Sequence, residues 1–148
     1  MWRWKVAAVT LALSLLSGGC AERPVEVDPG VLAEVGKIGT VVWKQRQEGL
    51  MGSEPVVTYA FLVDVGRDTE GESLKHAIAS LHARNWVTSV DDLPRGIWLK
   101  SPKWPDAVLD VHMLSASTEY DEPEVKKTIK RQGVKADALV SVYAYHGI

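Results

Sequence analysis

The stretch Val-Val-Thr-Tyr-Ala-Phe-Leu-Val-Asp-Val, residues 56–65, carries the clearest strand signal in the chain. Its odd-numbered positions hold Val, Tyr, Phe, Val and Val, and its even-numbered positions are also largely apolar. Successive side chains of a strand point to opposite faces of a sheet, and β-branched and aromatic residues favour strands. Because both faces of this segment are largely apolar, we predict that it lies in the centre of a sheet.

Helix signals stand on either side of this strand. Asp28-Pro29 can cap and start a short helix whose apolar residues continue to Ile38. The segment Thr69-Glu70-Gly71-Glu72 fits a capping box, and apolar residues then follow at helical spacing until Asn85, a suitable left-handed stop. A third helix is indicated over 121–132, with acids in its first turn, bases later and Gly133 after it.

The remaining apolar segments alternate like strands and are separated by turn residues. We predict strands at 40–46, 86–90, 97–101, 107–114 and 138–145, with loops at 47–55 and 115–120. The predicted fold is α+β. It has a mainly antiparallel sheet of five or six strands, one main helix packed on a face, and one or two shorter helices.

The N-terminal segment has the layout of an export signal. Arg3 and Lys5 precede the uncharged stretch 6–16, which is too short to span a bilayer as a helix. The small residues 17–19 then lead to Cys20. This layout resembles the bacterial lipoprotein signal peptide, although Ser17 stands where that family usually has Leu. The alternative is an ordinary secretory signal followed by a chance cysteine.

The resemblance implies that a diacylglyceryl group, with fatty-acyl chains such as palmitate, is attached to the Cys20 thiol. It also implies removal of residues 1–19 and attachment to the extracytoplasmic face of the cell membrane. Residues 20–27 would then be a tether, and residues 28–148 a single α+β domain. Cys20 is the only cysteine, so the chain forms no internal disulfide, and lipidation would remove an exposed free thiol.

The charge balance argues against a nucleic-acid partner. The chain has 17 Lys and Arg against 19 Asp and Glu. Loss of Arg3 and Lys5 with the signal would leave 15 against 19, a net charge of −4. Nucleic-acid binding asks for a basic face, which this composition does not favour.

One predicted hairpin brings together residues that could take part in proton transfer or metal binding. If Leu99 lies opposite Leu109, then Asp110 and His112 share a face with Trp98 and Lys100. A carboxylate and an imidazole at i and i+2 could transfer protons or bind a metal. The alternative is an exposed face with mixed polar residues. No third ligand or nucleophile is identifiable by spacing, so we expect no metal and no cofactor.

Two tryptophans are candidates for a binding surface. Trp98 and Trp104, with Lys100, could form an aromatic platform for a sugar, a peptide or a protein. The alternative is that Trp98 covers part of the sheet and Trp104 packs between Pro102 and Pro105.

Three functions are compatible with these observations. The first is a non-enzymatic, lipid-anchored envelope protein that binds an envelope protein or cell-wall partner. In general style the chain is similar to small actinobacterial lipoproteins of unknown function. The second is a cell-envelope hydrolase that uses Asp110 and His112, although the sequence has no nucleophile elbow, phosphate loop or zinc-protease motif. The third is a surface inhibitor or immunity protein.

Overall fold

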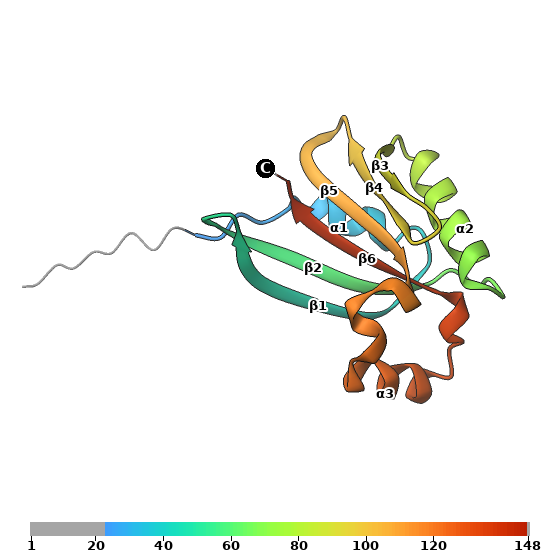
Figure 1. The fold of residues 1–148 in the computed structure, drawn as a ribbon. Helices are drawn as coiled ribbons and strands as arrows, with labels where there is room; N and C mark the ends of the chain where they lie inside the picture. Colours follow the sequence, from blue (N-terminus) through green and yellow to red (C-terminus); the bar gives the residue numbers. More distant parts are fainter. Residues whose placement is uncertain (1–22, 148) are drawn as a thin grey trace, which may run out of the picture.

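A single six-stranded antiparallel sheet with three α-helices forms the fold, which confirms the predicted α+β class (Figure 1). The computed structural model describes residues 23–147. The predicted signal peptide and Cys20 lie outside the described residues. The elements are α1 Pro29–Val35, β1 Thr40–Met51, β2 Glu54–Asp64, α2 Glu70–His82, β3 Val87–Asp92, β4 Gly96–Ser101, β5 Trp104–Met113, α3 Pro123–Gln132 and β6 Leu139–His146, with 3-10 turns η1 Leu114–Ala116, η2 Thr118–Asp121 and η3 Ala136–Ala138.

The strand order is β1-β2-β6-β5-β4-β3, and every neighbouring pair of strands is antiparallel. Strand β2 contains most of the apolar segment 56–65, and it is an interior strand between β1 and β6, as predicted. The last strand, β6, inserts between β2 and β5 and so joins two local groups of strands into one sheet.

The two faces of the sheet are covered differently. Helices α1 and α2 pack on one face and form the main core with apolar residues of β2, β4, β5 and β6. Helix α3 packs on the other face, where a smaller core includes Leu62, Val125 and Leu139. Figure 1 shows α1 behind the strands and α3 at one end of the sheet, so part of the second face has no helix over it.

The predicted helix ends have the expected chemistry. The Asp28 carboxylate accepts a hydrogen bond from the Gly30 amide at 2.7 Å, and the Thr69 hydroxyl accepts one from the Glu72 amide at 3.2 Å. Asn85 is left-handed, with φ of 65°, and Gly133 ends α3 with φ of 66°. Glu70 has another role, since its carboxylate accepts hydrogen bonds from the amide and hydroxyl of Ser115.

Two loop predictions are wrong. The predicted loop 47–55 is a continuation of the β1–β2 hairpin, which pairs as far as Met51 with Glu54 around Gly52. These β1 residues are mostly exposed, so they carry no apolar alternation that would reveal a strand. The connection between the predicted strands 97–101 and 107–114 is also shorter than predicted, because β5 already begins at Trp104. The predicted loop 115–120 does connect β5 to α3, and it contains two 3-10 turns.

The described part of the predicted tether lies against the domain. Val25 forms a parallel bridge with Val56, and Val27 is buried in the main core. The Glu26 carboxylate accepts hydrogen bonds from Arg46 and Tyr59, and these bonds lower its pKa. The folded domain therefore begins before Asp28.

Gly39, in the connection between α1 and β1, lies tightly against the end of β2. A Cβ at Gly39 would lie 2.2 Å from the Asp64 carbonyl oxygen, whereas a Cβ at Gly49 would have no atom within 4 Å. We predict that Gly39→Ala lowers the free energy of unfolding by about 1–3 kcal/mol. The matched control, Gly49→Ala, should change it by less than about 1 kcal/mol. Urea unfolding measures both, and equal stability of the two variants would contradict this account of the α1–β1 junction.

Candidate functional site

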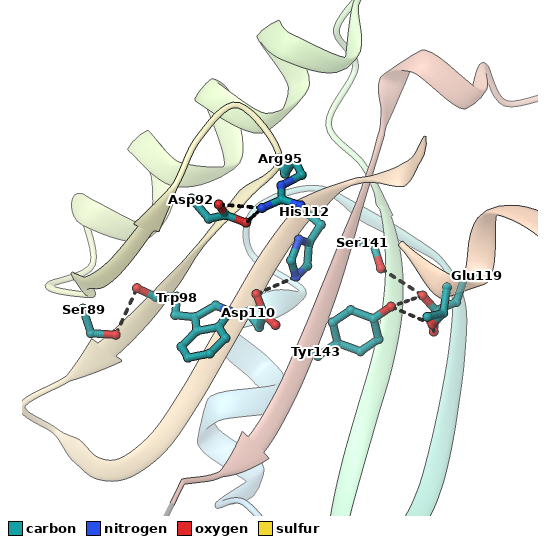
Figure 2. A network of polar contacts seen from close by, with 10 residues as sticks. Ser89, Asp92, Arg95, Trp98, Asp110, His112, Glu119, Ser141 and Tyr143 are labelled. Carbon is teal, nitrogen blue, oxygen red and sulfur yellow. Dashed lines mark hydrogen bonds and ion pairs between the residues drawn. The ribbon is translucent and has the colours of Figure 1, made fainter. Parts of the chain in front are cut away.

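Two transverse rows of side chains lie on the part of the sheet that α3 leaves open. Cross-strand pairing places Trp98 opposite Asp110, and Asp110 opposite Tyr143. The next row places His112 opposite Ser141. Figure 2 shows these side chains on one face, with α1 behind the strands. The rows bring together β4, β5 and β6, which are far apart in the sequence.

The Asp110 and His112 side chains approach closely. His112 Nε2 lies 2.6 Å from Asp110 Oδ1, and the two side chains are 20% and 15% exposed. The contact is not in line with the ring N–H, and Asp110 Oδ1 has no well-aligned hydrogen-bond donor among the described residues. We therefore treat it as a charge contact that forms fully only when the imidazole is protonated.

Gly96 makes room for the imidazole. Gly96 is the cross-strand partner of His112, and a Cβ at this position would lie 2.5 Å from His112 Nδ1 and 2.4 Å from the Val111 carbonyl oxygen. Within the described residues His112 Nδ1 is buried and has no hydrogen-bond partner. The absence of a side chain at Gly96 thus allows His112 to fold down over its neighbouring strand.

A buried carboxyl group lies beside these rows. Glu119, in η2, is 3% exposed and accepts a hydrogen bond from the Tyr143 hydroxyl. Ser141 and Thr118 donate longer hydrogen bonds to it, at 3.4 and 3.3 Å. No salt bridge joins Glu119 to a basic side chain in the part of the chain that the structure describes. Hydroxyl groups therefore supply its hydrogen-bond donors.

Two tyrosines on this face are held in the protonated form. Burial raises the pKa of Tyr143, and its hydrogen bond to Glu119 raises it further. Burial also raises the pKa of Tyr145, with a smaller contribution from the charge of Asp110. Both hydroxyls therefore keep their protons across the physiological pH range, and that of Tyr143 donates to Glu119. The ring of Tyr143 lies 5.9 Å from that of His112, edge to face, and links the two polar groups of the site.

The hairpin geometry is as predicted from the sequence. Leu99 lies opposite Leu109, and Trp98, Lys100, Asp110 and His112 share one face. The predicted platform of Trp98 with Trp104 is not formed. Trp104 packs against the main core on the opposite face, where it stacks on Trp86 with ring centroids 6.0 Å apart.

Four polar residues of the site were missed by the sequence analysis. Ser141 and Tyr143 alternate with buried residues of β6, so their face could have been inferred, but not their neighbours. Thr118 and Glu119 follow a strand in a segment with no periodic pattern. Only the packing of η2 against β6 reveals that Glu119 belongs to this site.

The described residues do not offer a metal site. No group of three or more His, Cys, Asp or Glu side chains in residues 23–147 is arranged to bind a metal ion. Within the same range, no helix is both long and apolar enough to cross a membrane.

Comparisons with models of protein families, with curated proteins and with solved structures find no match to this chain.

Removal of the Tyr143 hydroxyl tests the buried carboxyl group. Tyr143→Phe should lower the free energy of unfolding by about 1–3 kcal/mol, because Glu119 stays buried and loses a donor. Tyr120→Phe is the matched control, since Tyr120 is 47% exposed. Thermal unfolding measures both variants. In the double variant Tyr143→Phe with Glu119→Gln, the losses should be non-additive, and strict additivity would contradict the coupling.

Proposed function

We propose that this chain is a lipid-anchored, non-enzymatic envelope protein that binds a partner protein through the open face of its sheet. The observation that carries this proposal is the exposure of Trp98 on that face. Trp98 is 43% exposed, although a tryptophan of an ordinary sheet is largely covered by packing.

The surroundings of Trp98 resemble the centre of a protein interface. Its cross-strand neighbour Val90 is 41% exposed, so the two side chains form a small apolar patch at the β3–β4 edge. Lys100 and Asp110 add charges of both signs on the same face. An exposed aromatic anchor with a polar rim is typical of residues that contribute most to protein–protein binding.

The polar groups beside Trp98 favour binding over catalysis. Ser141 is fully buried and Glu119 nearly so, and both are engaged with neighbouring side chains. Five pockets of about 270–550 Å³ lie elsewhere on the described part of the chain, and Asp110 and His112 line none of the five. A hydrolase needs a concave site in which its reactive groups meet a substrate.

A cell-envelope hydrolase is the second candidate, because Asp110 and His112 approach to 2.6 Å and a carboxylate with an imidazole could transfer protons. The two candidates differ in what Asp110 does. In the binding protein Asp110→Asn should leave Trp98-dependent binding largely intact, whereas in the hydrolase it should abolish function. A surface inhibitor or immunity protein would be a special case of the binding protein, with an incoming enzyme as its partner.

The proposed anchor is the lipidated Cys20, at the extracytoplasmic face of the cell membrane. Two residues lie between Cys20 and Arg23, so the two are at most about 10 Å apart in extended chain. Val25 is already paired with Val56, so only this short connection would remain between the lipid and the domain. The partner surface would therefore work close to the membrane.

Site-specific crosslinking tests the partner surface. A photoreactive amino acid at position 90 should capture an envelope protein in living cells, and Trp98→Ala should reduce the yield by about tenfold. Tyr120→Ala, which removes an aromatic side chain that is 47% exposed on η2, should leave the yield unchanged. Capture that survives Trp98→Ala, or that only follows protein abundance, would contradict the proposal.

Replacement of Cys20 tests the anchor separately. Cys20→Ser should prevent lipid attachment and release the protein from membranes or block its processing. Membrane fractionation and metabolic labelling with palmitate measure the two effects. If Cys20→Ser protein stays on the membrane in unchanged amount, the lipid anchor is wrong, whatever the outcome of the crosslinking.

A further inference from the structure

A second site lies on the other side of the molecule from Trp98. A pocket of about 550 Å³ opens between the end of α2, the β4–β5 turn and α1. Its volume is in the range of small-molecule sites in proteins, about 300–1,000 Å³. The residues of its wall that matter here are Glu34, Arg84, Trp86, Ser101, Lys103 and Trp104.

The end of α2 builds one wall of this pocket. The left-handed conformation of Asn85 turns the chain back, so that the Trp86 amide donates to the Leu81 carbonyl at 3.1 Å. The same turn buries the Trp86 side chain to 1% exposure and leaves Arg84 at the exposed rim. The Arg84-Asn85-Trp86 sequence thus places a cation and an indole at one pocket.

The inner wall holds one hydroxyl group that can still donate a hydrogen bond. Trp86 Nε1 has no hydrogen-bond partner among the described residues, but it is too deeply buried for a ligand to reach. Ser101 is buried at the start of the β4–β5 turn. Its oxygen accepts from the Lys103 amide at 3.2 Å, which leaves the hydroxyl hydrogen able to donate. A ligand oxygen at this wall would accept a hydrogen bond from the Ser101 hydroxyl.

The charges at the rim favour an anion. Arg84 and Lys103 have no salt bridge in the part of the chain that the structure describes, while the one carboxylate of the wall, Glu34, lies 2.6 Å from the Lys37 ammonium. His82 also lines the pocket and contacts the Thr88 hydroxyl at 3.0 Å. The carboxylate is therefore offset by Lys37, and the two unpaired cations determine the preferred charge of a ligand.

The pocket also has an aromatic wall. Trp104 is half-buried and stacks on Trp86 with an angle of 23° between the ring planes. The Lys103 ammonium lies 4.3 Å from the centroid of the Trp104 ring, which keeps this cation beside the aromatic surface. A flat ring that carries a negative charge could contact the Trp104 ring and the Lys103 ammonium at the same time.

We propose that this pocket binds a small aromatic carboxylate. Its ring would lie against Trp104, and its carboxylate would pair with Arg84 and Lys103 and accept a hydrogen bond from the Ser101 hydroxyl. This site is separate from the proposed partner surface, because Trp98 and Trp104 lie on opposite faces of the sheet. The proposal therefore does not depend on the protein partner or on the lipid anchor.

Titration of the full chain with a naphthalene carboxylate tests the proposal. The indole N–H signal of Trp86, assigned through its own backbone resonances, should shift in the NMR spectrum because the naphthalene ring current acts on this pocket wall, and the shift should saturate as the probe fills the pocket. The corresponding naphthyl alcohol, which lacks the charge, should bind at least about fivefold more weakly. Equal affinity for the two probes, or an unchanged Trp86 signal at saturation, would overturn the proposal.

Exposed variants assign the binding to this pocket without disturbing the core. Arg84→Gln and Lys103→Gln should each weaken carboxylate binding about fivefold and have little effect on the alcohol. Arg131→Gln, on the exposed side of α3, is the matched control and should bind like the unmodified chain. If Arg84→Gln and Lys103→Gln bind the carboxylate as tightly as Arg131→Gln, the charge recognition proposed here is wrong.

Discussion

The insertion of β6 between β2 and β5 is the constraint on which the rest of the structure depends. The three strands come from the middle and the end of the chain, and their antiparallel pairing joins the β1–β2 hairpin to the β3–β4–β5 meander. Val140, Val142 and Ala144 are fully buried on one face of β6, beneath α1 and α2. Without this strand, neither group of strands would have a partner along its inner edge.

The same strand explains why the two faces differ. On its other face, β6 presents Leu139 to the small core under α3, and then Ser141 and Tyr143 to the open region. Helix α3 covers Leu139, whereas the polar side chains of Ser141 and Tyr143 lie between η2 and β5. A buried carboxyl group at Glu119 is compatible with this position because three hydroxyl groups surround it. The polar site thus occupies the boundary between the covered and the open part of one face.

The distribution of tryptophans separates two kinds of surface. Trp98 stands on a strand near the sheet edge with few neighbours, as expected for an anchor that a protein partner would cover. Trp104 is fixed between Trp86 and the start of α1, where a Cβ at Gly30 would come within 2.7 Å of its ring. Rigid aromatic walls of this kind suit small ligands, whereas exposed single aromatics suit larger partners.

The sequence by itself determined the α+β class, the interior strand 56–65, the helix caps and the shared face of Asp110 and His112. Each of these follows from local periodicity or from the chemistry of neighbouring residues. Only the tertiary structure decided that Glu119 and Tyr143 join that face, that Trp104 leaves it, and that residues 47–51 form a strand. These outcomes depend on which strands pair and on what covers them. Pairing between distant strands depends on the burial of whole faces of the sheet, and a local sequence pattern does not reveal it.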